Sequence, residues 1–348
     1  MKVTIKQVAE LAGVSFKSVS RVINKEPGVK EELRLKVEKA IKELNYQPNI
    51  SARRLRGKSS TIGFIYNNPN SNYVISMLHG ILAACRKNDF ELVVHPVEGN
   101  VSEEEIVKEV HALMQRSSLA GLVLTPPISE NEAIIKMLDD ANIVFSRIIS
   151  SSTVPTDVER TIYIDDCNAA YRITSHLIEN KHRDIFFFNG DREHKSSGER
   201  LHGYMKAMQD HGLKVEPQFV LEGKYTFESG MQRGKAVLAT EQRPTAIFSC
   251  NDEIAAGVMF AARMSGVEVP SELAIVGFED SPFSRQSWPS LTTAKQPNDN
   301  IASHATQILI DAISKRSTDK RSDGLKGSYD HGYLPEMIIR GSSQSNLS

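Results

Sequence analysis

The sequence predicts an α/β protein in which a small all-α head precedes two doubly wound parallel-sheet subdomains. Amphipathic helical patterns fill the first part of the chain, up to residue 46. From Thr61 onward, short apolar strands alternate with longer helical stretches. Repeated β-α units imply parallel sheets that helices cover on both faces. The strands are too many for one sheet, so we expect two sheets with a boundary within residues 150–156.

The strand and helix patterns follow one another along the second part of the chain. Expected strands cover residues 62–66, 91–95, 121–125, 143–148, 161–164, 184–189, 219–221, 246–250 and 273–278. Expected helices lie near residues 74–88, 103–116, 168–180, 198–211, 228–240 and 253–265.

The first 24 residues carry the pattern of two short helices joined by a tight turn. Thr4 and Gln7 fit a capping box at the start of the first helix. Gly13 interrupts the apolar pattern, and Ser15 can cap the second helix. The polar and basic outer face of that second helix is typical of a helix-turn-helix that enters DNA. On spacing alone, a surface hairpin would give the same pattern.

The charge distribution favours a nucleic-acid partner for the head. The formal net charge of the whole chain is only −1. Residues 1–60 nevertheless contain nine Lys, five Arg and six Glu, a net charge of +8 that leaves −9 for the rest. A basic head on an acidic body is suited to binding the phosphate backbone of DNA.

A short basic segment, residues 47–60, follows the head and has two interpretations. Pro48 breaks the preceding helix, and Asn49 can cap a short helix of about two turns. Leu55 beside Arg53 suits insertion into the minor groove, and such a short helix needs external support. A plain basic linker is the alternative.

Composition excludes several other classes of protein. The three cysteines, Cys85, Cys167 and Cys250, are scattered among apolar residues, which suits a reducing cytoplasm rather than a disulfide framework or metal site. We expect no cofactor and no metal. No leader or membrane span is indicated, and catalytic signatures such as G-x-S-x-G or GxxxxGK[ST] are missing. A binding protein is therefore favoured over an enzyme.

Four segments together resemble the LacI/GalR family of bacterial transcription regulators: T4-IKQVAELAGVS, S18-VSRVIN, K42-ELNYQPN and A52-RRLRGKSSTIG. The resemblance implies that Phe16, Lys17 and Arg21 read bases and that capping hydroxyls contact phosphate. It also implies a hinge helix whose Leu55 inserts between base steps. The DNA-binding residues expected on this basis are Thr4, Ser15, Phe16, Lys17, Ser18, Arg21, Asn24, Asn49, Ala52, Arg53 and Leu55.

The resemblance also implies the subdomain arrangement of periplasmic sugar-binding proteins. The head is expected at residues 1–46 and the core at 61–340, followed by a disordered tail at 341–348. The expected first subdomain covers residues 61–160 and 292–324, and the expected second covers 161–291 and 325–340.

Polar residues that follow the expected strands predict a ligand site between the subdomains, because ligands bind at the carboxyl ends of parallel strands. Donors and acceptors there, with tyrosines to stack, suit a polyhydroxylated ligand such as a sugar. The resemblance matches Arg200 to the effector-binding arginine of the family. The expected effector-binding residues are Tyr73, Arg147, Ser196, Arg200, Tyr225, Asn251, Asp252 and Glu279.

The expected function is that of a homodimeric repressor that binds a pseudo-palindromic operator and a carbohydrate effector. A sugar phosphate or a purine remains an alternative effector, because Arg147, His194 and Arg200 could also hold an anion. A sugar-uptake protein and a sugar-processing enzyme are more remote alternatives. Whether the effector releases or strengthens DNA binding stays open, as does activation in place of repression.

Overall fold

The computed structural model describes residues 3–23, 28–44, 46, 60–97, 102–317 and 331–344. The chain divides into two compact units, residues 1–60 and 61–348, and each is considered by itself. No helix within these described stretches is long and apolar enough to cross a membrane.

The first unit is a small helical domain, as the sequence predicts. Its described helices are α1 (Ile5–Ala12), α2 (Phe16–Ile23) and α3 (Glu31–Glu43). Each helix turns one apolar stripe inward, which is how short amphipathic helices become stable together. The shared core contains Val8, Ala9, Val19, Val22, Val37, Ala40 and Tyr46.

The second unit contains two six-stranded sheets. The first sheet has the order β11-β5-β4-β3-β1-β2, and every described strand pair in it is parallel. Its strands are β1 (Thr61–Tyr66), β2 (Glu91–Pro96), β3 (Gly121–Leu124), β4 (Phe145–Ser150), β5 (Thr161–Ile164) and β11 (Gly332–Tyr333).

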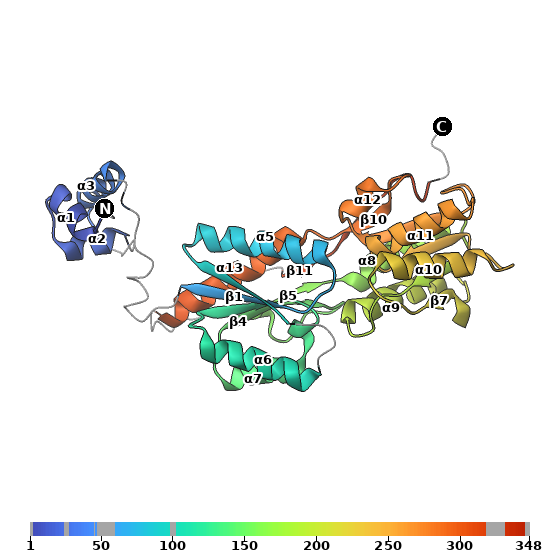
Figure 1. Cartoon of the computed structure of the whole chain (residues 1–348), viewed down its shortest axis with the longest axis horizontal. Helices are drawn as coiled ribbons and strands as arrows, with labels where there is room; N and C mark the ends of the chain where they lie inside the picture. Colours follow the sequence, from blue (N-terminus) through green and yellow to red (C-terminus); the bar gives the residue numbers. More distant parts are fainter. Residues whose placement is uncertain are drawn as a thin grey trace. The chain divides into compact units, whose positions relative to one another are not determined.

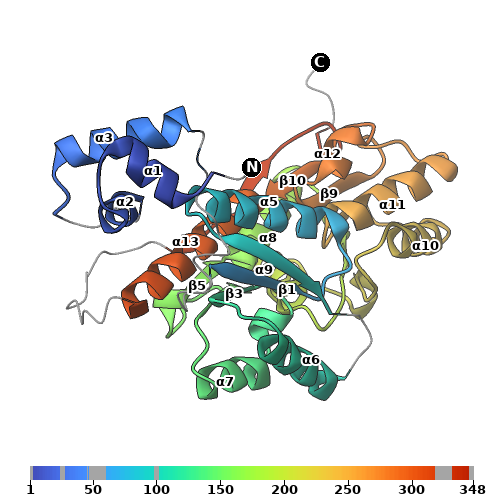
Figure 2. The same cartoon turned by 60° about the vertical axis from the view of Figure 1, so that its left-hand side comes forward.

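Helices cover both faces of the first sheet (Figures 1 and 2). On one face lie α5 (Ser71–Lys87) and α13 (Asn298–Ser317), which share a core with the strands through Met77 and Leu309. On the other face lie α6 (Glu103–Arg116) and α7 (Glu132–Asp140), which pack through Val110 and Leu138. The helices α7 and α13 have no counterpart among the expected helices.

The second sheet has the order β12-β10-β9-β8-β6-β7, and its β10–β12 pair is antiparallel. Its strands are β6 (Ile185–Phe188), β7 (Val220–Leu221), β8 (Ala246–Ser249), β9 (Ala274–Glu279), β10 (Thr292–Lys295) and β12 (Glu336–Ile338). Two helix pairs cover it, α8 (Asp166–Glu179) with α9 (Lys195–Asp210) and α10 (Phe227–Leu238) with α11 (Asp252–Met264), while α12 (Pro282–Gln286) follows β9. Short 3-10 helices occupy Ile128–Glu130, Val158–Arg160 and Pro217–Phe219.

Strand pairing corrects the expected subdomain boundaries. β5 pairs with β4, so residues 161–164 belong to the first sheet and not to the second. β10 pairs with β9 in the second sheet, whereas β11 pairs with β5 in the first. The chain therefore changes subdomain after residue 164, after residue 295 and between β11 and β12. Local sequence patterns do not show these changes, because they predict that a strand forms but not which strand it pairs with.

The described part of the expected disordered tail is ordered. Ser342 and Ser343 are buried, and the Ser342 backbone N–H donates to the Ser290 carbonyl at 3.0 Å. The Ser343 hydroxyl lies 2.9 Å from His176 Nε2. Serine is common in linkers, but here short hydroxyls satisfy buried backbone groups, so polar composition gave the wrong expectation for residues 341–344.

Candidate functional site

The helix-turn-helix caps are formed as the sequence predicts. The Thr4 backbone N–H donates to Gln7 Oε1 at 2.8 Å, and Gly13 adopts the left-handed conformation (φ 64°) that ends α1. The Ser15 hydroxyl accepts a hydrogen bond from the Ser18 backbone N–H at 3.1 Å. These contacts fix the start of both helices and the turn between them.

The outer face of α2 presents the residues expected to contact DNA. Val19 and Val22 are buried in the head core, whereas Phe16 and Lys17 are exposed and Arg21 is half-buried. The expected roles of Thr4, Ser15 and Ser18 in phosphate contact stay predictions, and Asn24, Asn49, Ala52, Arg53 and Leu55 lie outside the described residues.

Arg200 lies at the centre of a polar cleft in the second unit. Its Nε donates to Asp166 Oδ1 at 2.8 Å, and its Nη1 donates to the Cys250 carbonyl at 2.7 Å. The guanidinium carbon lies 3.8 Å from the centroid of the Phe278 ring. Arg200 is only 3% exposed, so its charge is held by a buried ion pair and an aromatic face.

Carboxylates that were not among the expected site residues surround this arginine. Asp166, the first residue of α8, also accepts a hydrogen bond from the Ser150 hydroxyl at 2.6 Å. The Ser150 backbone N–H donates to Glu130 Oε1 at 2.8 Å, and burial raises the pKa of Glu130 to about 7. Asp166 directly follows an expected strand, so the rule that selected the other candidates could have found it.

Glu279 joins the two subdomains across the cleft. It ends β9 of the second sheet, and its Oε2 accepts a hydrogen bond of 2.8 Å from Asn70 Nδ2, at the start of α5. Burial raises the pKa of Glu279 to about 7, although Arg200 partly offsets the shift. Its φ of 104° is unusual for a residue with a side chain, and such strain is often found at functional sites.

Tyr73 and Tyr225 are both buried and both line the cleft. The Tyr225 hydroxyl lies 2.7 Å from Ser197 Oγ and 3.4 Å from Ser196 Oγ. The Tyr73 backbone N–H donates to Asn70 Oδ1, which caps α5. The inner cleft is thus formed by residues of both subdomains, namely Asn68, Asn70, Tyr73, Pro126, Ser150, Ile164, Asp166, His194, Ser196, Arg200, Tyr225, Glu279 and Gln296.

Asn251 and Asp252 do not line this cleft. Asn251 Oδ1 caps α11 by accepting from the Ile254 backbone N–H at 2.9 Å. Asp252 is fully buried, and its carboxylate accepts from the Ser281 backbone N–H and the Thr293 hydroxyl at 2.6 Å each. Burial raises the pKa of Asp252 to about 8. Both residues therefore hold the strand ends together behind the site.

Arg147 corrects one expectation. The strand β4 continues to Ser150, so Arg147 lies inside it and not at its carboxyl end. Arg147 Nη2 pairs with Asp157 at 2.7 Å, and its Nε donates to Thr161 Oγ1 at 3.1 Å. Despite burial, hydrogen bonds from Arg147 and Arg160 hold the pKa of Asp157 at about 2. Arg147 lines neither this inner cleft nor the outer pocket beside it. It instead fixes the loop before β5.

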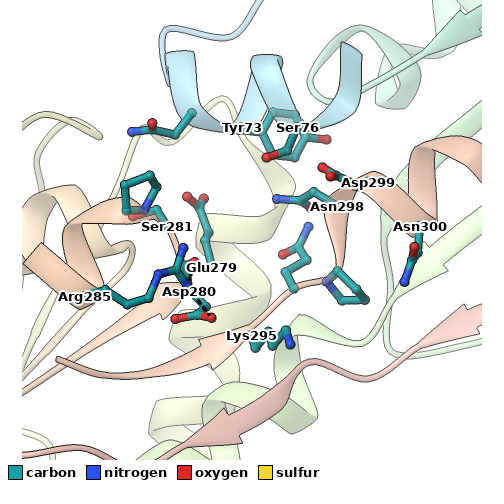
Figure 3. Close-up of a pocket in the computed structure, with 14 residues that line it drawn as sticks. Tyr73, Ser76, Glu279, Asp280, Ser281, Arg285, Lys295, Asn298, Asp299 and Asn300 are labelled. Carbon is teal, nitrogen blue, oxygen red and sulfur yellow. Dashed lines mark hydrogen bonds and ion pairs between the residues drawn. The ribbon is translucent and has the colours of Figure 1, made fainter. Parts of the chain in front are cut away.

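An outer pocket of about 400 Å³ adjoins the inner cleft. Figure 3 shows Tyr73 and Ser76 on α5, Glu279 and Arg285 opposite them, and Asn298 at the start of α13. The two cavities share Tyr73, Glu279 and Gln296. The inner cleft encloses only about 40 Å³, about a tenth of the volume of the outer pocket.

Comparison with known proteins agrees with this architecture. "Bacterial regulatory proteins, lacI family" matches residues 4–49, and "Periplasmic binding protein-like domain" matches residues 174–332. The HTH-type transcriptional repressor PurR of Pasteurella multocida (strain Pm70) is 31% identical and aligns with 99% of each chain. This chain belongs to the LacI family.

Two further proteins also match nearly the whole chain. Catabolite control protein A of Priestia megaterium is 30% identical, over 92% of this chain and 95% of its own length. The Lac repressor dimer bound to operator and the anti-inducer ONPF is 25% identical, with a TM-score of 0.75 and coverage of 99% and 100%. The LacI-family chain described here is a DNA-binding transcription regulator that responds to a small molecule, and not an enzyme.

Proposed function

We propose that this regulator is a homodimeric repressor whose affinity for a pseudo-palindromic operator is set by a carbohydrate bound in the inner cleft. The observation that carries the proposal is the hydrogen bond between Asn70 and Glu279, beside the buried Arg200–Asp166 pair. It joins the two subdomains through the same polar groups that a sugar hydroxyl would engage. The relatives described above include proteins named as repressors.

Ligand entry provides a physical link between binding and conformation. The inner cleft encloses about 40 Å³, far less than the ~300 Å³ or more of typical small-molecule pockets, so a sugar ring enters it only if the subdomains move apart. This movement breaks the Asn70–Glu279 hydrogen bond, and ligand hydroxyls then replace it. The angle between the subdomains therefore depends on the ligand, which is the differential interaction that a two-state switch requires.

The head would transmit this change to DNA. Two heads in a homodimer read two half-sites, and their separation depends on the subdomain angle. Phe16, Lys17 and Arg21 are proposed to contact base edges, with Leu55 of the hinge inserted between base steps. Coupling is reciprocal, so operator binding changes effector affinity by the same factor. Because the proposed partner is DNA, we also propose a cytoplasmic location.

The test uses the full-length protein and an operator selected from random DNA. Fluorescence anisotropy of the operator is measured while candidate sugars are added at fixed ionic strength, because salt alone changes DNA affinity. A sugar that alters operator affinity, and whose own affinity is changed by operator by the same factor and in the same direction, supports the proposal. Absence of any sequence-preferring DNA binding contradicts it.

A substitution in the head separates base reading from charge. Arg21→Ala is expected to lower affinity for the selected operator by about 10- to 100-fold and to relax its sequence preference, since a bidentate base contact contributes about 1–3 kcal/mol. Lys39→Ala removes the same charge from the exposed face of α3 and is the matched control. Equal loss on random DNA would show that Arg21 contacts phosphate instead.

A further inference from the structure

The two arginines that line the inner cleft and the outer pocket already pair with carboxylates. Arg200, the only cation lining the described inner cleft, pairs with Asp166 at 2.8 Å and lies 3.9 Å from Glu279. In the outer pocket, Arg285 pairs with Asp280 at 2.9 Å. Burial lowers the pKa of His194, so this side chain is neutral near pH 7.

Carboxylates outnumber cations over the two cavities together. The lining includes Asp166, Glu279, Asp280 and Asp299, against Arg200, Arg285 and Lys295. Glu130 adds a further carboxyl group directly behind the Ser150 backbone N–H. Arg200 and Arg285 are already paired, and Lys295 is exposed to solvent. An incoming phosphate or carboxylate would therefore compete with carboxylates for the paired arginines, and would place like charges side by side in a partly buried site.

Several polar atoms of the outer pocket have no hydrogen-bond partner and can accept a hydrogen bond from a ligand. Within the described stretches, Gln296 Oε1, Asn298 Oδ1 and Ser281 Oγ are buried without a partner. Gln296 and Asn298 are 7% and 8% exposed, and both line the outer pocket. Figure 3 labels Asn298 there. Buried acceptors without a donor are costly, so a ligand rich in hydroxyl groups would satisfy them.

We propose that the effector is an uncharged, hydroxyl-rich molecule, and that Glu279 excludes its phosphorylated and carboxylated counterparts. This inference rests on the proposed effector site and narrows the class of ligand that the site takes. Glu279 is placed to act as the specificity-determining residue because it lines both cavities and lies close to Arg200. The N–H groups of Arg200 that are not already used can then donate a hydrogen bond to a hydroxyl group of the ligand, which carries no charge.

The test compares matched compounds on the full-length wild-type protein. Neutral mono- and disaccharides, their phosphates, the corresponding uronic acids, purine bases and inorganic phosphate are screened by thermal shift and then titrated by calorimetry. A neutral sugar is expected to stabilise the protein, and its phosphate and uronate to bind about 100-fold more weakly, as like-charge contact predicts. Inorganic phosphate is expected to have no effect beyond that of chloride at equal ionic strength.

Several results would overturn the inference. An anionic sugar that binds as tightly as its neutral counterpart would do so, as would a purine base that binds more tightly than every sugar. A screen in which no neutral sugar binds also counts against it. Operator binding is measured in the same preparation. Release of DNA by a sugar phosphate would reject this inference but would still support the proposed regulator. Loss of sequence-preferring DNA binding would instead reject the regulator.

Substitution of the proposed residue provides the second readout. At pH 8, above its pKa of about 7, Glu279 is largely ionised. Glu279→Gln keeps an oxygen for Asn70 and removes that charge, so the neutral-to-anion affinity ratio measured at pH 8 is expected to fall at least tenfold. Glu241→Gln removes a carboxylate from an exposed loop before β8 and is expected to leave the ratio unchanged. If the Glu279→Gln variant no longer binds any sugar, Glu130→Gln tests the same ratio. If the neutral-to-anion affinity ratio is unchanged in whichever of the two variants still binds sugar, the carboxylates of the cleft do not exclude anions.

Discussion

Arg200 shows how a residue proposed to bind the ligand can also be part of the fold. Its guanidinium pairs with the buried Asp166 carboxylate and lies over the Phe278 ring. Removing the arginine leaves that carboxylate buried and without its charge partner, which is more damaging than losing one contact. Binding and stability must therefore be measured together for any change at this position.

We expect Arg200→Ala to lower the free energy of unfolding by about 3–5 kcal/mol, in addition to abolishing the effector response. The double variant Arg200→Met with Asp166→Asn should recover most of this loss, because neither a charge nor a large cavity remains. It should still be blind to the effector. Urea unfolding measures stability, and operator anisotropy measures response. Wild-type stability in the Ala variant would contradict the buried pair.

Asp252 makes stability depend on pH. Burial raises its pKa from 3.8 to about 8, so the folded protein binds this proton more tightly than the unfolded chain. Stability should consequently fall as pH rises from about 4 to about 8, where the unfolded carboxyl is ionised and the folded one loses its proton. Glu130 and Glu279 act in the same direction up to about pH 7.

In Asp252→Asn, this contribution to the pH dependence is removed. The Asn oxygen can accept from the Ser281 N–H, and the Thr293 hydroxyl can rotate to accept from the new amide. The decline in midpoint temperature between pH 5 and 8.5 should be shallower than in the wild type. Thermal unfolding at constant ionic strength measures it. Parallel pH profiles would show that Asp252 is ionised in the folded protein throughout.

The sequence predicts the centre of the site better than its surroundings. Arg200, Tyr73, Tyr225 and Glu279 were found because they follow strands or match a family motif. Arg147 satisfies the same criteria but pairs with Asp157 inside its own subdomain. A charged residue near a strand end has no visible partner in the sequence, so ligand contact and structural pairing cannot be told apart.

At the scale of elements, closely packed helix pairs position the cleft. A Cβ atom added to Gly80 of α5 would overlap the Asp299 carbonyl and lie 2.8 Å from the Ala302 Cβ, both on α13. Gly80 thus allows the two helices to touch backbone to backbone. The first turn of α13 also carries Asn298 of the outer pocket, so this contact links helix packing to the ligand site.

We expect Gly80→Ala to lower the free energy of unfolding by about 1–3 kcal/mol, because the added methyl group forces α5 and α13 apart. Gly198→Ala is the control, since nothing lies within 4 Å of a Cβ at this exposed position of α9. Alanine there should instead stabilise the protein by about 0.5–1 kcal/mol. Equal effects of the two changes in urea unfolding would contradict close packing at Gly80.

Most elements of the core could be predicted because their signals are local. Four apolar residues in a row predict β6, and a capping box with helical periodicity predicts α6. The subdomain of β5, β10 and β11 could not be predicted in this way. β5 and β10 each pair with the strand that precedes them, whereas β11 pairs with the distant β5. A local pattern shows that a strand forms but not which strand it pairs with.

For the whole molecule, exposed apolar side chains on the second subdomain favour association. Trp288, the only tryptophan of the chain, is 87% exposed in the segment after α12. Met264 and Phe260 of the neighbouring helix α11 are 66% and 44% exposed. Water-exposed aromatic and Met side chains of this kind are typical of interfaces. We therefore place Trp288 in the interface of the proposed homodimer.

Trp288→Asp is expected to shift the protein toward monomer in analytical ultracentrifugation and to weaken operator affinity about 100-fold. The second head of a dimer binds at high effective concentration, and a monomer loses this advantage. The wild-type tryptophan emission should move to longer wavelength on dilution, as the indole becomes exposed to water. Val154→Asp, at a similarly exposed apolar position in the first subdomain, is the control and should remain dimeric. If the Trp288 variant stays dimeric and the wild-type emission does not depend on concentration, the interface lies elsewhere. A carboxylate buried in the interface would weaken the dimer, and an indole buried there would change its emission on dilution.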